Sequence, residues 1–248
     1  MSSAALAWRQ FRFERRLFWR NPSAAFFNFT LPFLFLIMIA SVFGADRKEL
    51  DILIPGIAGM SVLGTTFTAL TYTFVFNREQ GILKRIRGTP MPPIAYFGGV
   101  IGSAVANAIV QVALIIVIGH VFYDVSWPHS YFELVLFVVL GVIAFGSLGI
   151  AFAHVIPNFD AAAAYVNAVF LPVIFISGVF YDAARAPGFL KGIAQALPLK
   201  HLIDGLSGAM VKGTSLGANV SALGVIAAWA LLGMFFAVRG FSWEQRRT

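Results

Sequence analysis

Residues 24–44 read AAFFNFTLPFLFLIMIASVFG, a stretch of 21 residues without a charged side chain. At a rise of 1.5 Å per residue, about 20 apolar helical residues cross the hydrocarbon core of a bilayer. Five further apolar runs are long enough to do the same. They lie at 52–76, 94–123, 132–156, 161–181 and 220–238. No run alternates as a barrel strand does, so the sequence predicts an all-α integral membrane protein with six transmembrane helices.

The composition supports one membrane domain over residues 1–248. The chain is 59% hydrophobic and 12% charged, which is more apolar surface than a soluble domain of this length can bury. The chain has no cysteine, which excludes disulfides and thiolate chemistry, and its four scattered histidines predict no metal site. It also lacks the GxxxxGK[ST] phosphate loop, so we expect it to bind no ATP or other cofactor itself.

Basic residues indicate the orientation of the helices. Twelve of the 18 Lys and Arg residues precede the first run, lie between the second and third, or follow the sixth; the other six lie on the opposite side. Because cytoplasmic loops are enriched in Lys and Arg, both termini are predicted to be cytoplasmic. The basic residues form short clusters between apolar runs, a pattern that favours membrane orientation and disfavours nucleic acid as a partner.

Residues 5–20 are predicted to form an amphipathic helix lying along the cytoplasmic lipid interface. At 100° per residue its arginines fall on one stripe with aromatic side chains beside it. The stripe and its flanking tryptophans are Arg9, Arg12, Arg16, Arg20, Trp8 and Trp19. A topology anchor and a role in transmitting motion are both open interpretations.

The cytoplasmic segment 77–93 reads NREQGILKRIRGTPMPP. A helix beginning at Arg78 would place Ile82, Leu83 and Ile86 on one apolar ridge between charged residues. Gly88, Thr89 and Pro90 would end it. We therefore predict a short cytoplasmic helix over 78–89 that fits a groove on a partner protein; an ordinary basic loop is the alternative.

The segment 182–219 combines short apolar pieces with glycine and proline. Pieces of about 10 residues are too short to span a bilayer, so two re-entrant half-helices dipping into the outer leaflet are predicted between the fifth and sixth spans. An external hairpin on the membrane surface is the alternative.

The six spans carry no Asp, Glu, Lys or Arg away from their ends. Ion-coupled transporters and channels usually need such groups at mid-membrane, so energy is expected to come from outside the chain. Uncharged polar and aromatic side chains are the candidates for a substrate path, with packing between helices as the favoured alternative for the polar ones. The candidates are Thr68, Tyr72, Asn107, Gln111, Asn167 and Phe170.

Three stretches carry a resemblance to a known family: the arginine-rich start ending in Arg20-Asn21-Pro22, residues 77–93, and residues 175–205, FISGVFYDAARAPGFLKGIAQALPLKHLIDG. In order and spacing they resemble the permease subunits of the ABC-2 class of ATP-binding-cassette exporters. The chain is most similar to bacterial drug and antibiotic efflux permeases of the daunorubicin-resistance type.

The resemblance implies a non-catalytic half-transporter that pairs with a second copy of itself and with two copies of a separate ATPase. The ATPase would use ATP and magnesium and push on the cytoplasmic helix. Positions that match the family's ATPase-coupling segment are Glu79, Gly81, Leu83, Arg85, Thr89 and Pro90. Positions that match the end of the fifth span and the re-entrant turn are Pro172, Ser177, Gly178, Pro187, Pro198 and Leu199.

The interpretation that follows is the membrane subunit of an ATP-driven exporter in a bacterial plasma membrane. Uncharged, aromatic spans suit a hydrophobic or amphiphilic cargo such as a drug, an antibiotic or a lipid. Multidrug resistance by efflux is the expected role. Export of a lipid-linked polysaccharide or glycolipid, a secondary transporter or channel, and a membrane scaffold are the alternatives.

Overall fold

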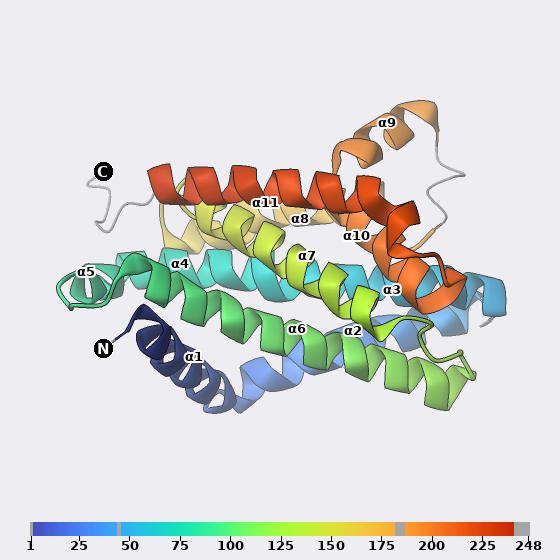
Figure 1. Ribbon diagram of the computed structural model, residues 1–248, viewed down its shortest axis with the longest axis horizontal. Coiled ribbons are helices and arrows are strands. Elements are labelled where there is room, and N and C mark those ends of the chain that lie inside the picture. The colour runs from blue at the N-terminus through green and yellow to red at the C-terminus, as the bar shows by residue number, and fades with distance from the viewer. Residues whose placement is uncertain (1, 44–45, 182–186, 241–248) are drawn as a thin grey trace.

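Long helices aligned along one axis build this fold (Figure 1). The computed structural model describes residues 2–43, 46–181 and 187–240. The long elements are α2 (Pro22–Phe43), α3 (Arg47–Leu63) continuing through the π-helical turn η1 (Gly64–Thr68) into α4 (Ala69–Glu79), α6 (Pro93–Tyr123), α7 (Tyr131–Phe152), α8 (Phe159–Ile176) and α11 (Val220–Gly240). The short elements are α1 (Ser3–Trp19), α5 (Ile82–Arg87), α9 (Gly188–Ala196), α10 (Pro198–Ser207), η3 (Gly208–Lys212) and η4 (Leu216–Asn219).

The helix lengths confirm the all-α integral membrane class. Within the described ranges, five stretches are long and apolar enough to cross a bilayer: 47–79, 93–123, 131–152, 159–176 and 216–239. The first predicted span lies in α2, whose apolar segment Ala25–Ser41 is shorter than these five; Gly44 lies outside the described residues. A chain of such helices satisfies its backbone hydrogen bonds internally, as the bilayer requires.

The two ends of the bundle differ. The start of α1, the elbow between α4 and α5, and the end of α11 lie together at what we call the α5 end (Figure 1). At the opposite, α9 end, α9 projects away from the bundle beyond α10 and the first half of α11 (Figure 1).

Several predicted boundaries are wrong for local reasons. The second span starts at Arg47, five residues before the predicted run, because a charged turn containing Glu49 extends the helix at its N-terminus, where an acidic residue is favoured. The fourth span ends at Phe152, ahead of a turn over residues 153–155. The fifth span ends at Ile176, because Gly178 takes a left-handed backbone with φ +77°.

Close backbone approaches hold the centre of the bundle. A Cβ added at Gly149 of α7 would lie 2.6 Å from the carbonyl oxygen of Phe67 in η1. One added at Gly233 of α11 would lie 2.4 Å from the Ser147 hydroxyl of α7. These glycines let α7 pack directly on α3–α4 and on α11, whereas few side chains of α8 are buried.

Candidate functional site

The elbow between α4 and α5 contains the residues predicted to couple the chain to a partner. α4 continues to Glu79, the chain turns at Gly81 with φ +69°, and α5 begins at Ile82. A left-handed backbone is accessible to glycine at little cost. The prediction of one helix over 78–89 is therefore wrong in its bounds, since Gly81 separates the Arg78-Glu79 pair from the ridge.

Arg78 joins the elbow to the end of α7. The residue is 8% exposed, and its guanidinium donates hydrogen bonds to the carbonyl oxygens of Ala153 at 2.8 Å and Ile156 at 2.5 Å. A third, longer contact reaches Pro157 O at 3.4 Å. Ala153 caps the C-terminus of α7, where the last carbonyls carry partial negative charge and favour a cation, whereas Ile156 and Pro157 lie in the α7–α8 turn.

Glu79 joins the same elbow to the start of α8. Its Oε2 accepts a hydrogen bond from the backbone N–H of Phe159 at 2.8 Å. The Asn158 side chain accepts from Ala161 N at 2.9 Å and caps the same helix. Two consecutive residues thus connect α4 to both sides of the α7–α8 turn, and the elbow, this turn and the start of α8 form one connected unit.

The apolar ridge of α5 faces inward. Leu83 is 2% exposed and belongs to the hydrophobic core, and Ile86 packs against that core; Ile82 is half-buried. The prediction that this ridge fits a groove on a partner protein is wrong in that respect, because the chain's own core covers the ridge. The exposed surface of the elbow is basic and polar: Lys84, Arg85, Arg87, Gly88, Thr89 and Pro90.

α1 packs obliquely on the first half of α6 (Figure 1). A Cβ added at Gly99 would lie 2.5 Å from Gln10 Cβ, whereas one added at Gly98 would lie 3.8 Å from Ala7 Cβ. Glycine therefore permits the close crossing. The arginine stripe points away from this contact: Arg9, Arg12, Arg16, Arg20, Trp8 and Trp19 are all exposed.

The half-buried face of α1 carries charge into the contact. Burial raises the pKa of the Glu14 carboxyl, and a hydrogen bond donated by Gln10 at 2.7 Å lowers it in part. Arg15 donates to the side-chain oxygen of Asn107 on α6. The amphipathic pattern thus predicted the exposed stripe of α1. It did not single out Glu14 and Arg15, which lie on the side of α1 that contacts α6.

Asn107 and Gln111 hold neighbouring helices together. The Gln111 amide donates to the Asn28 carbonyl of α2, and its oxygen accepts from the Thr65 hydroxyl of η1 at 2.5 Å. Both side chains are less than 10% exposed. These bonds support the packing interpretation for the two residues over substrate contact.

The other candidates for a substrate path are spread over several surfaces. Asn167 is exposed on α8, Tyr72 packs edge-on against the Phe159 ring, and Thr68 has a buried hydroxyl without a hydrogen-bond partner among the described residues. Phe170 lines an apolar cavity of about 490 Å³ between α3–η1, α7, α8, α10 and α11. Other aromatic residues in its wall are Phe67, Phe145, Phe152, Trp229 and Phe236.

Two short helices occupy the segment predicted to hold half-helices. Pro187 precedes α9 and the buried Pro198 opens α10, where a proline lacks only a hydrogen bond that the first turn does not make. α10 packs inside the bundle against α3, α7 and α11. Ser177 and Gly178 form the turn after α8, and residues 182–186 of the predicted segment lie outside the described residues.

Comparison with known proteins supplies an independent line of argument. The family model "ABC-2 type transporter" matches residues 3–211. The chain is 23% identical over 178 residues to the inner membrane transport permease YadH of Escherichia coli K12, covering 69% of each chain. It is 22% identical to nodulation protein J of Sinorhizobium fredii, covering 69% of this chain and 66% of the relative. It is 25% identical to the putative transport permease YvfS of Bacillus subtilis, covering 58% and 59% respectively.

Proposed function

This chain belongs to the ABC-2 type transporter family and is a membrane transport permease, and we propose that it is the non-catalytic membrane subunit of an ATP-driven exporter. A separate ATPase, in two copies, would use ATP and magnesium while two copies of this chain move the cargo between them. Family membership implies the ABC ATPase partner and the membrane setting. Multidrug efflux from the cytoplasm or inner leaflet of a bacterium is the proposed role.

The proposal rests on one observation: the elbow between α4 and α5 is exposed on one side and fixed to the α7–α8 turn on the other. Lys84 and Arg85 face solvent on α5, while Arg78 and Glu79 fix the elbow to the α7–α8 turn. A force applied to α5 is therefore transmitted to long helices. The basic surface suits an acidic groove on the ATPase, since complementary charge directs the docking of protein partners.

The apolar cavity beside Phe170 supports a hydrophobic or amphiphilic cargo. Ligand cavities of several hundred cubic ångströms lined by aromatic side chains bury drug-sized molecules, and this one has a volume of about 490 Å³. Its wall contains no Asp, Glu, Lys or Arg among the described residues, which disfavours an ionic cargo.

The proposed orientation places the α5 end in the cytoplasm, where the ATPase is. Twelve of the 18 Lys and Arg residues lie in segments of that side. Energy would come from ATP alone, so collapse of the proton and sodium gradients at constant cellular ATP should leave efflux unchanged.

The test is charge reversal on the exposed elbow. Arg85→Glu should weaken co-purification of the ATPase and abolish its stimulation by substrate, with a loss of affinity of about tenfold or more. Arg47→Glu is the control, because Arg47 is also an exposed arginine but lies at the α9 end. If Arg85→Glu and the control bind and stimulate the ATPase equally well, the elbow is not the docking site and the proposal loses its main support.

A further inference from the structure

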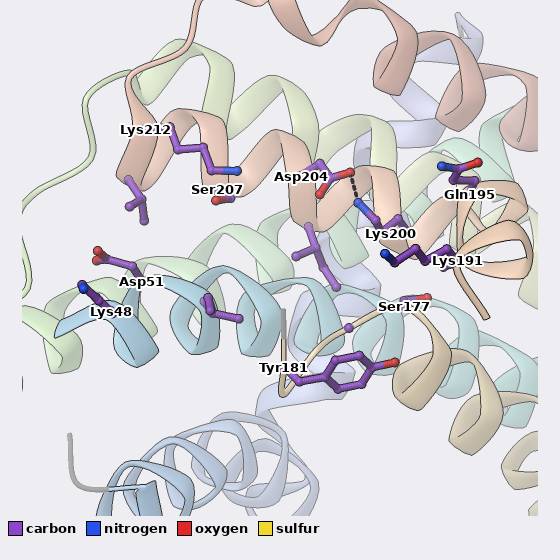
Figure 2. A pocket seen from close by; sticks show the side chains of 15 residues that line it. Lys48, Asp51, Ser177, Tyr181, Lys191, Gln195, Lys200, Asp204, Ser207 and Lys212 are labelled. Carbon is purple, nitrogen blue, oxygen red and sulfur yellow. Dashed lines mark hydrogen bonds and ion pairs between the residues drawn. The ribbon is translucent and has the colours of Figure 1, made fainter. Parts of the chain in front are cut away.

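A second cavity, at the α9 end, is polar (Figure 2). It has a volume of about 680 Å³ and lies between the first turns of α3, the turn after α8, α9, α10 and η3. Close packing holds α3 against the turn after α8 next to the cavity: a Cβ added at Gly56 of α3 would lie 2.0 Å from the carbonyl oxygen of Val179. The cavity is therefore a built feature of the fold.

Positive charge is concentrated in this cavity. Among the described residues, its wall contains four lysines, Lys48, Lys191, Lys200 and Lys212, and two aspartates, Asp51 and Asp204. The segments of this side of the protein carry seven acidic and six basic residues in the sequence, so the surplus of cations is specific to the cavity. Figure 2 shows the four lysines around the same hollow, contributed by α3, α9, α10 and η3.

The acidic residues of the cavity wall neutralise the four lysines only in part. Lys200 pairs with Asp204 one turn away, and the other three lysines form no ion pair with the residues that the structure describes. Ser177, in the wall of the cavity, is fully buried and its hydroxyl has no hydrogen-bond partner among those residues. Such a lining binds anions, because lysine ammoniums attract phosphate as point charges.

The faces of α9 place the cavity beside lipid. Lys191 and Gln195, one turn apart, line the cavity. On other faces of the helix, Phe189 is 71% and Ile193 46% exposed. A helix with one apolar exposed face and one polar face is typical of the boundary between headgroups and acyl chains.

We propose that this cavity binds a phosphate-bearing anion, with the headgroup of an anionic phospholipid as its principal source. The lysines from α3, α9, α10 and η3 surround the phosphate, and the apolar face of α9 lies against the acyl chains. Occupation would join four elements that otherwise meet around an open, like-charged space. The site requires only that the chain is a membrane protein, and does not depend on the ATPase or the cargo.

Binding of phosphatidylglycerol tests the proposal. The full-length chain, with any subunits that it retains, is titrated with phosphatidylglycerol, phosphatidylcholine and soluble glycerol phosphate, and bound ligand is counted by native mass spectrometry. Lys191→Gln and Lys212→Gln, alone and combined, each remove an exposed charge from the wall. Arg47→Gln removes one from the same end outside it. We expect phosphatidylglycerol to bind in preference to phosphatidylcholine, and the double variant to lose about tenfold in affinity while Arg47→Gln loses little.

Three results are distinguishable. Weaker phosphatidylglycerol binding in the double variant, with no effect on phosphatidylcholine, supports the lipid headgroup. If glycerol phosphate binds as tightly as the lipid and depends on the same lysines, the site stands and its source is a soluble anion. If neither anion responds to the lysine substitutions, or Arg47→Gln weakens binding equally, the proposal is overturned. Thermal unfolding of each variant verifies that the fold is intact.

Discussion

Replacing Arg78 by methionine should break the brace between the α4–α5 elbow and the end of α7. The wild-type guanidinium makes two well-placed hydrogen bonds, at 2.8 Å to Ala153 O and 2.5 Å to Ile156 O. Hydrogen bonds involving a charged group contribute about 1.5–3 kcal/mol each. Methionine also removes the desolvation penalty of a buried cation, which offsets part of the loss. We expect a net decrease of about 2–4 kcal/mol in the free energy of unfolding.

Thermal unfolding of the purified chain measures this loss. For a chain of this size 1 kcal/mol corresponds to about 2–4 °C, so Arg78→Met should lower the Tm by about 4–16 °C. Arg78→Lys keeps the charge but not the planar fork, and should fall between wild type and methionine. Lys84→Met is the control, because Lys84 is exposed in the adjoining helix. A Tm for Arg78→Met equal to that of Lys84→Met would refute the brace.

Three further outcomes follow from other regions. The chain has no cysteine, so Gly88→Cys should react with a membrane-impermeant maleimide only from the cytoplasm and Ser215→Cys only from outside; the reverse pattern would invert the proposed orientation. Burial raises the pKa of Glu14, so the ionised carboxylate destabilises the fold, and the stability of the protein should fall as pH rises through the folded pKa. Glu14→Gln should therefore raise the Tm at neutral pH but not at acid pH. An equal effect at both pH values would show that ionisation of Glu14 does not affect stability. Gly99→Ala should weaken the packing of α1 on α6, measured as faster proteolysis within α1. Gly98→Ala is the control, because there is room for a Cβ at Gly98. Equal proteolysis of the two variants would show that α1 and α6 do not need glycine at position 99.

Hydropathy predicted the membrane-spanning helices well, because a bilayer requires a certain length and an apolar composition, and both can be read from the sequence. It predicted their ends less well, since those depend on other forces. The charged turn at Arg47 is helical although it lowers the hydropathy of the run. Helix α8 ends at Ile176 because of backbone geometry at Gly178, within a run that remains apolar to Tyr181.

The elbow shows what a helical pattern leaves undetermined. The spacing of Ile82, Leu83 and Ile86 indicates that one face is buried, yet it does not say whether the partner is another protein or the chain's own core. The answer depends on residues distant in sequence, and the structure buries Leu83 in the core. The roles of Arg78 and Glu79 escaped detection for the same reason, because their partners lie about 75 to 80 residues further along the chain. The sequence features that could have indicated these roles are the adjacent Arg78 and Glu79 at the end of α4 and Asn158, a residue type favoured as a helix N-cap.

These contacts suggest how a push on α5 would reach the proposed cargo cavity. Glu79 holds the first turn of α8 through Phe159, and α8 packs on α4 with few of its own side chains buried. A helix with few neighbours moves at lower cost than one inside the core, so under the proposed mechanism α8 would yield when the elbow is displaced. The same helix carries Phe170 into the wall of the apolar cavity. Movement at the α5 end would therefore change the shape of that cavity without passing through the tightly packed contact between α3–α4 and α7.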